Sequence, residues 1–364
     1  MALTQVDQGL LGSNAQYTGF KNRIINGAMV IDQRNAGASI TPTNGQYCVD
    51  RWQNAVNVSS KYSCQQVADA PAGFTYSLKA TSLSAYTIGA GELAGFRQYI
   101  EGYNIADLGQ GTSNATSFTL SFWVKSSLTG TFGGVVSNDN NRTWAFTYTI
   151  SSANTWEYET ITITGQTGGT WLTTNGIGLS VIFSLACGST YLTTPAQWNS
   201  NNSYGATGQG SVLATNGATW QVTGVQLEAG TTASPFEYRQ YGTELALCQR
   251  YYEKSFAQGT APAEGVDNNF QTTGAGYATN GLYIPNVGFK VTKRTTATVT
   301  VFRPNVTATN GNFAVYSSAL GGWNTSTTTV NSANDTTFSI NLTSNINVDK
   351  GYAILGAWTA SAEL

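Results

Sequence analysis

Residues 195–210, PAQWNSNNSYGATGQG, hold the side chains of this sequence that are best suited to binding chemistry. Trp198 and Tyr204 offer aromatic faces onto which the apolar side of a sugar ring packs, and amides such as that of Asn201 hydrogen-bond to hydroxyl groups. Long segments without regular structure are uncommon and are often functional. We therefore predict a carbohydrate site that includes Trp198, Asn201 and Tyr204. The alternative is that Trp198 folds back as a lid on the core.

The sequence offers few residues that are suited to acid–base catalysis. Glu157 and Glu159 share one face of an expected strand, but carboxylates placed in this way more often form a solvated surface than a glycosidase pair. Histidine is absent, which removes the commonest general base near neutral pH and the commonest zinc ligand. The sequence contains no G-x-S-x-G, Walker or H-E-x-x-H motif. We expect no catalytic residues and no enzymatic activity.

The four cysteines argue against a zinc or redox site, because Cys48, Cys64, Cys187 and Cys248 are far apart and form no C-x-x-C motif. We expect buried free thiols in a protein that is made in a reducing cytoplasm. The residues predict no cofactor and no metal ligand.

Composition limits the partners. Only 10% of the residues are charged and the net charge is -2, so the basic surface that nucleic acid requires is missing. No apolar run approaches the roughly 18 residues that span a bilayer, and the first residues lack the pattern of a signal peptide. We therefore expect no nucleic acid partner and no membrane insertion.

A chain of 364 residues exceeds what one hydrophobic core usually supports, which predicts two domains.

The segment 219–254 marks the joint between these domains. The run TWQVTGVQLEAG predicts a buried strand, which Gly230 and Pro235 end. From Thr243 apolar residues recur at three- to four-residue spacing, which predicts a short amphipathic helix. Short aromatic and β-branched runs on both sides predict strands. The predicted fold is all-β, with an N-terminal extended arm (1–46), a β jelly-roll sandwich (47–240), a helix and linker (241–268) and a second small β-sandwich domain (269–364).

Several of these runs resemble known families. W-x-V-x-x-V-Q-L-E-x-G followed by S-P-F-E-x-R, together with FRQYIEG and TLSFWVKS, is similar to carbohydrate-binding jelly-roll modules of the four/nine type. ALCQRYYEKS, KNRIINGAM, DRW and the terminal AEL resemble stretches of bacteriophage tail-fibre proteins. This resemblance implies a homotrimeric virion protein, made in the host cytoplasm, that contacts tail or adaptor proteins and a host surface polysaccharide. Modules of the resembled type often hold a structural calcium ion, for which we name no ligands.

Further site residues follow from this resemblance. The arm is expected to attach to the virion through apolar anchors, or else to be a poorly ordered terminus; the anchors are Leu3, Val6, Leu10, Leu11 and Phe20. Leu245, Cys248 and Tyr252 have heptad spacing for a trimer interface, although the same face could dock on its own jelly roll. In fibres the C-terminal unit is often the distal tip, which makes Trp323 and Asn324 candidate receptor contacts unless Trp323 packs inward.

We thus expect a tail-fibre subunit that attaches by its N-terminus and binds a host glycan during adsorption. The main alternative is a structural virion protein, such as a head fibre or decoration, without receptor binding. A polysaccharide depolymerase is less consistent with the missing catalytic motifs.

Overall fold

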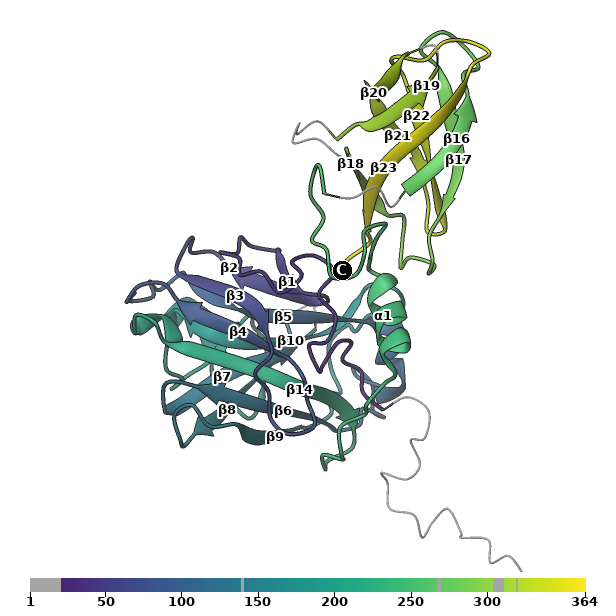
Figure 1. The fold of residues 1–364 in the computed structure, drawn as a ribbon. Coiled ribbons are helices and arrows are strands. Elements are labelled where there is room, and N and C mark those ends of the chain that lie inside the picture. Colours follow the sequence, from purple (N-terminus) through teal and green to yellow (C-terminus); the bar gives the residue numbers. More distant parts are fainter. Residues whose placement is uncertain (1–20, 139–140, 267–269, 304–310, 319) are drawn as a thin grey trace, which may run out of the picture. The chain divides into compact units, whose positions relative to one another are not determined.

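The computed structural model describes residues 21–138, 141–266, 270–303, 311–318 and 320–364, and these form two compact units (Figure 1). Unit 1 comprises the described residues up to Val30 together with Gly37–Tyr241 and Leu364, and unit 2 comprises Ile31–Ala36 and Gly242–Glu363. Both units are built mainly of antiparallel sheets, and a single short α-helix occurs in the described ranges. The prediction of an all-β chain with one short helix is confirmed. None of the helices in these ranges is long and apolar enough to cross a membrane.

Unit 1 is a two-sheet sandwich (Figure 1). The seven-stranded sheet has the spatial order β1 (Tyr47–Val49), β2 (Trp52–Val56), β5 (Leu93–Glu101), β10 (Ile177–Cys187), β7 (Gly130–Ser137), β8 (Thr143–Ile150) and β12 (Trp198–Asn199). The five-stranded sheet has the order β3 (Tyr62–Val67), β4 (Ser77–Ser82), β14 (Thr219–Ala229), β6 (Phe118–Ser126) and β9 (Glu157–Ile163). A short parallel pair, β11 (Leu192–Thr193) and β13 (Gly205–Ala206), and four 3-10 turns complete the unit: Gly102–Asn104, Ala106–Leu108, Ser189–Tyr191 and Val212–Ala214.

Aromatic side chains fill the space between the two sheets. Alternate residues of each strand point to the same face, so β6 contributes Phe118, Leu120 and Phe122 to the core. Phe183 of β10 lies at the centre, where its ring centroid is 4.9 Å from that of Phe122 and 5.5 Å from that of Trp220. The indole Nε1 of Trp220 donates a hydrogen bond of 3.0 Å to the Tyr148 hydroxyl, so the buried polar atom is satisfied.

The segment 21–29, KNRIINGAM, is part of this sandwich. Ile24 and Met29 are fully buried in the core. The side-chain amide of Asn26 donates to the backbone carbonyl of Asp50 (2.9 Å), and the backbone carbonyl of Asn26 accepts from the Trp52 indole (3.2 Å). These bonds join KNRIINGAM to DRW. The predicted extended arm spans residues 1–46, whereas the structure packs its described residues into the two units, with 21–30 and 37–46 in unit 1 and Ile31–Ala36 in unit 2. The predicted anchors Leu3, Val6, Leu10, Leu11 and Phe20 lie outside the described residues.

The same motif also joins the end of the last strand. The Asn22 side chain accepts from the backbone N–H of Leu227 (3.1 Å), and its own backbone N–H donates to Glu237 (2.8 Å). A hydrogen bond of 2.9 Å links the N–H of Val225 to the carbonyl of Gly27. A side chain at Gly27 would place its Cβ 2.1 Å from the Val225 oxygen, so only glycine permits this approach. The runs KNRIINGAM, VQLE and SPFEYR therefore form one packed junction.

Unit 2 is a smaller β structure built around its last strand, β23 (Gly351–Ser361). Four strands pair with β23, namely β15 (Tyr252–Lys254), β16 (Phe270–Ala275), β18 (Thr298–Phe302) and β19 (Phe313–Ser317), and β20 (Gly322–Ser326) pairs with β19. A three-stranded sheet has the order β17 (Leu282–Gly288), β22 (Thr337–Leu342) and β21 (Thr328–Ala333). The apolar final strand is thus central in unit 2.

The helix is shorter than the sequence indicated. α1 spans Tyr241–Gln249, and the chain then turns so that Tyr252 lies in β15. Cys248 is 1% exposed and Leu245 is half-buried. The heptad pattern of Leu245, Cys248 and Tyr252 is therefore not realised on one helix, because pairing with β23 takes Tyr252 into a sheet. The stretch 242–256, which the sequence places in a helix and linker (241–268), is part of unit 2.

Residues Ile31–Ala36 belong to unit 2, although they precede the sandwich of unit 1 in sequence. The Gln33 side chain donates to the carbonyl of Tyr252 (2.9 Å), and the Arg34 guanidinium lies 3.7 Å from the centroid of the Tyr252 ring. Arg34 also forms an ion pair with Glu363 at 2.9 Å. An early segment, the residues after α1 and the C-terminal AEL are thereby joined.

Candidate functional site

The outer face of the seven-stranded sheet carries two different rows of side chains. Register aligns one row across β5, β10, β7 and β8, and it is polar: Tyr99, Ser180, Ser137 and Thr143. The adjacent row is mostly apolar: Arg97, Ile182, Val135 and Ala145. Strand alternation directs both rows away from the sandwich core.

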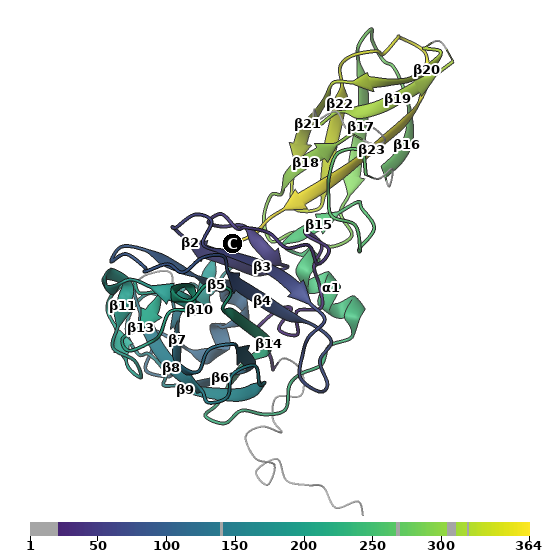
Figure 2. The ribbon, with the colours of Figure 1, turned by 60° about the vertical axis from the view of Figure 1, so that its left-hand side comes forward.

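The chain following β10 folds over the apolar row. Ala206 and Tyr204 pack with Val135, Ala145 and Ile182 in a small hydrophobic cluster. β13 lies against β7, β8 and β10 (Figure 2). The Gln209 side chain fixes this arrangement, since it accepts from the N–H of Ala206 (2.8 Å) and donates to Ser184 (2.7 Å). The segment around β13 thus covers the apolar row and leaves the adjacent polar row uncovered.

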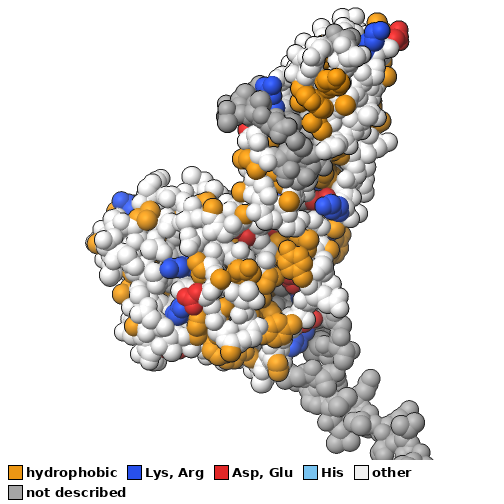
Figure 3. Space-filling view, viewed as in Figure 1, with side chains coloured by type: hydrophobic (Ala, Val, Ile, Leu, Met, Phe, Trp, Pro, Cys, Tyr) orange, Lys and Arg blue, Asp and Glu red, His pale blue; other side chains and the backbone are white. Residues whose placement is uncertain are grey.

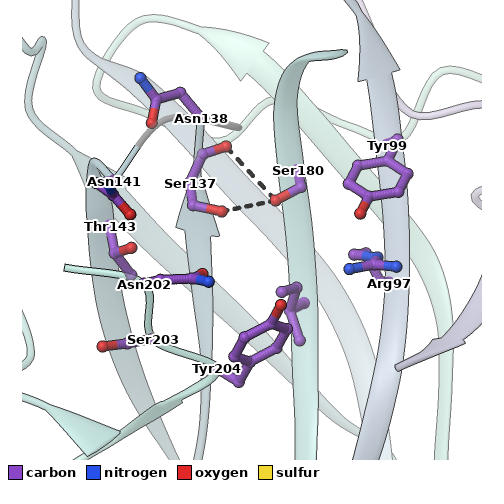
Figure 4. A pocket seen from close by; sticks show the side chains of 11 residues that line it. Arg97, Tyr99, Ser137, Asn138, Asn141, Thr143, Ser180, Asn202, Ser203 and Tyr204 are labelled. Atoms are coloured by element: carbon purple, nitrogen blue, oxygen red, sulfur yellow. Dashed lines mark hydrogen bonds between the residues drawn. The ribbon is translucent and has the colours of Figure 1, made fainter. Parts of the chain in front are cut away.

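A pocket of about 100 Å³ remains at this place (Figure 4). Its lining consists of Arg97, Tyr99, Ser137, Asn138, Asn141, Thr143, Ser180, Ile182, Asn202, Ser203 and Tyr204. Figure 4 shows Arg97 and Tyr99 on one side of the pocket and Asn141, Thr143 and Asn202 on the other. Hydroxyls, amides and one guanidinium therefore face a common space.

Hydrogen bonds hold several of these groups in place. The Ser137 and Ser180 hydroxyls are 2.7 Å apart on neighbouring strands. Nε of Arg97 donates to Gln53 (3.2 Å), and its guanidinium lies 4.2 Å from the centroid of the Tyr99 ring. The Arg97 guanidinium is thus oriented by the Tyr99 ring and by Gln53, neither of which carries a negative charge. The arrangement suits a polyhydroxylated ligand with a neutral or anionic group.

The structure separates the three residues predicted for the 195–210 segment. Tyr204 lines the pocket. Asn201 lies beside it, where its carbonyl accepts from Thr143 (2.7 Å) and its amide donates to Thr193 (3.0 Å). Trp198 lies elsewhere, with its ring centroid 5.6 Å from both Trp144 and Trp171 and its Nε1 donating to the carbonyl of Thr164 (2.7 Å). This is the lid-like position that was the alternative for Trp198.

The two residues predicted in unit 2 lie on a strand. Trp323 and Asn324 belong to β20, and Trp323 is 51% exposed. Its ring centroid is 5.4 Å from that of Tyr316, its partner across the β19–β20 pair. Trp323 does not pack inward. It forms an exposed aromatic pair with Tyr316.

The carboxylates considered for catalysis have structural contacts. Glu157 accepts hydrogen bonds from the backbone N–H groups of Ser151 (2.9 Å) and Ser152 (2.7 Å), which closes a turn. Burial, reinforced by the charge of Glu157, raises the pKa of Glu159. In the ranges that the structure describes, no three acidic or cysteine side chains come together as metal ligands would.

Five of the residues that line the pocket are not predicted by the sequence: Arg97, Tyr99, Ser137, Thr143 and Ser180. The signal for the first two was present, because FRQYIEG places Arg97 and Tyr99 two residues apart between buried Phe96 and Ile100. The others come from three separate strands, so only the register brings them together.

The comparisons with known proteins show distant structural similarity. No protein-family model matches the chain, and no curated protein matches its sequence. Among solved structures, the tailspike protein 4 enzymatically active domain of bacteriophage CBA120 is 14% identical, with a TM-score of 0.32 over 57% of this chain and 21% of that one. The chain thus matches about a fifth of that tailspike structure.

Two smaller proteins are matched over nearly their whole length. A CBM4 structure is 16% identical, with a TM-score of 0.29 over 56% of this chain and 98% of that one. A putative sugar binding protein from Bacteroides thetaiotaomicron is 11% identical, with a TM-score of 0.33 over 58% of this chain and all of that one (100%). Similarity of this degree does not identify a function.

Proposed function

We propose that this chain is a subunit of a bacteriophage tail fibre and binds a host surface glycan through the polar pocket of unit 1. The observation that carries the glycan-binding part is the convergence of hydroxyl, amide and guanidinium groups around one space of about 100 Å³. Sugar hydroxyls need directed donors and acceptors of this kind.

The pocket defines what part of a glycan it accepts. Its volume suits one sugar unit, such as a chain end or a side branch, better than a long polysaccharide backbone. Asn141 and Asn202 offer amides to ring hydroxyls, while Tyr99 and Tyr204 offer aromatic surface. Among the described lining residues only Arg97 is charged, so an acidic sugar is favoured over a basic one.

The fibre part of the proposal is supported by the motifs rather than by the pocket. KNRIINGAM, DRW, ALCQRYYEKS and AEL resemble segments of tail-fibre proteins. The structure gives most of these motifs a packing role, which leaves residues 1–20 as the part proposed to attach to a tail or adaptor protein. The proposed homotrimer rests on this resemblance, since the helix does not carry the expected heptad face. Native mass spectrometry tests it, and a monomer at micromolar concentration would contradict it.

Glycan binding is tested with the purified full chain on an array of bacterial surface polysaccharides, followed by calorimetry with the oligosaccharide that binds. Asn202→Ala is expected to lower affinity about fivefold or more, because an unpaired sugar hydroxyl costs about 1 kcal/mol. Asn199→Ala is the matched control, since that amide does not line the pocket. Equal affinities for both variants and the parent chain would refute the pocket as the site.

A structural virion protein without receptor binding remains the alternative function. Labelling the chain on intact particles distinguishes a tail from a head position, and blockade of phage adsorption by the purified chain supports receptor binding. Release of reducing ends from host polysaccharide, abolished by substitution of one carboxylate, would instead establish a depolymerase.

A further inference from the structure

A second hollow lies on the outer face of the five-stranded sheet of unit 1. One wall is the cross-strand pair of Trp123 on β6 and Tyr158 on β9, whose ring centroids are 5.3 Å apart. Phe74, Phe236 and Tyr238 form the opposite wall, with mutual centroid distances of 5.0 to 5.4 Å. We call this hollow the aromatic groove. Hydrophobic side chains gather on the face of unit 1 that carries β6 and β14 (Figure 3).

The floor of the aromatic groove is bare backbone. β14 has an irregular register between Thr223 and Gln226, and Gly224 within it has a φ of 61°. A Cβ at Gly224 would lie 2.7 Å from the ring of Phe74 and 3.1 Å from that of Trp123. Glycine therefore keeps the two walls close to the strand and leaves the space between them open.

The groove has a volume of about 490 Å³, and every described residue that lines it is uncharged. The lining residues are Ala72, Phe74, Ser121, Trp123, Tyr158, Gly224, Ala233, Ser234, Pro235, Phe236 and Tyr238. Tyr158 is 44% exposed and Tyr238 is 61% exposed. A ligand here must be neutral and must present flat apolar surfaces to the rings.

The exposed area argues against a protein as the occupant. With roughly 150–250 Å² for a whole aromatic side chain, Tyr158 and Tyr238 together present on the order of 160–260 Å². A stable protein interface buries about 800 Å² on each partner. The volume, in contrast, accommodates two or three sugar rings, and the apolar face of a pyranose packs on aromatic rings in the manner of Trp123 and Tyr158.

We propose that the aromatic groove binds the pyranose rings of a neutral polysaccharide, as a second glycan site on the opposite sheet of the sandwich from the polar pocket. The two sites differ in chemistry. The polar pocket fixes one sugar unit through hydrogen bonds and Arg97, whereas the groove holds successive rings through aromatic contact. Two sites on one unit also raise the effective affinity for a polysaccharide that reaches both. The groove stands on its own geometry and does not require the pocket to bind.

The test is calorimetry of the full chain with cellohexaose, xylohexaose and maltohexaose, and with hexagalacturonate as an acidic comparison. At least one neutral hexasaccharide is expected to bind. Any binding of hexagalacturonate should be unchanged in Trp123→Ala and Tyr158→Ala, because the groove offers no cation and only the polar pocket favours an acidic sugar. Trp123→Ala and Tyr158→Ala should each weaken binding about fivefold to tenfold. Tyr103→Ala is the matched control, because Tyr103 is 62% exposed and lies outside the groove.

The variants separate this proposal from the polar pocket. Asn202→Ala should leave hexasaccharide binding unchanged, and loss of binding only in that variant would assign the sugar to the pocket and overturn the groove. Absence of binding by all three neutral hexasaccharides at millimolar concentration would also overturn it. A parent chain that self-associates, and that Tyr158→Ala renders monomeric with unchanged sugar affinity, would identify a second copy as the occupant. Thermal melts of both groove variants exclude unfolding as the cause of any loss.

Discussion

Unit 2 contains an ion pair that is removed from water. Lys293 and Glu253 are both 0% exposed, and Nζ of Lys293 lies 2.5 Å from the Glu253 carboxylate. The ammonium also donates to the carbonyls of Gln249 (2.6 Å) and Val291 (2.9 Å). Burial lowers the pKa of Lys293, and the hydrogen bond and charge of Glu253 oppose that shift. The pair connects the end of α1 and β15 with the segment before β18.

Lys293→Met is predicted to destabilise unit 2 by about 3–5 kcal/mol, because it leaves the Glu253 carboxylate buried without its cation. At about 4 °C for each kcal/mol in a unit of this size, Tm falls by about 12–20 °C. The double variant Glu253→Gln/Lys293→Met removes both charges and should recover at least about 2 kcal/mol of this loss, since an uncharged pair carries no penalty for desolvated ions.

The assay is thermal and urea unfolding, followed by circular dichroism and checked for a separate transition of unit 2. Lys125→Met is the control, because its partner Asp69 is 49% exposed and an exposed ion pair contributes less than about 1 kcal/mol. A loss below about 1 kcal/mol for Lys293→Met, or a double variant as unstable as the sum of its two single variants, would refute the reasoning.

Three further predictions concern unit 1. Gly27→Ala should destabilise it by at least about 2 kcal/mol in urea unfolding, because the new Cβ meets the backbone oxygen of Val225; a neutral effect would contradict the close approach. Burial raises the pKa of the Cys187 thiol to about 12, so alkylation by iodoacetamide at pH 8 should be far slower in the native than in the unfolded chain, as mass spectrometry of the labelled peptide would show. Hydrogen bonds from the Gly89 N–H and from the Tyr86 hydroxyl lower the pKa of Glu92, so the ionised Glu92 stabilises the fold above its unfolded pKa and this contribution is lost as pH falls through its folded pKa. The difference in Tm between the parent chain and Glu92→Gln should therefore shrink from pH 6 to pH 3. A constant difference would contradict this prediction.

Strands were predictable from the sequence where the local pattern of apolar residues is sufficient to specify them. Short aromatic and β-branched runs predict strands, and one of these runs, TLSFWVKS, lies in β6 (Phe118–Ser126). Alternation and apolar runs report burial locally, so β14 and the central β23 were also predictable. The predicted helix was longer than α1, because apolar residues continue at three- to four-residue spacing past Gln249. The chain instead turns there, and the following strand β15 pairs with β23.

The candidate sites were harder to predict because they depend on register. Ser137, Ser180 and Tyr99 come from strands far apart in sequence, and their cross-strand alignment places them around one pocket. Trp198 has the residue type expected of a sugar site, yet Trp144 and Trp171 offer it a ring contact at the edge of the core. Residue type indicated the class of ligand, whereas tertiary packing determined which aromatic side chains are accessible.

The early segment Ile31–Ala36 has a consequence for how this chain is divided and inherited. A cleavage at the 241–242 bond would leave unit 2 without Gln33 and Arg34, which contact Tyr252 and Glu363 from the other side of the cut. Expression of residues 242–364 alone should therefore yield a weakened fold. A recombination that exchanges the later strands of unit 2 but retains residues 31–36, the stretch around Tyr252 and Glu363 would keep these contacts, so these three segments form a frame that tolerates exchange of the strands between them.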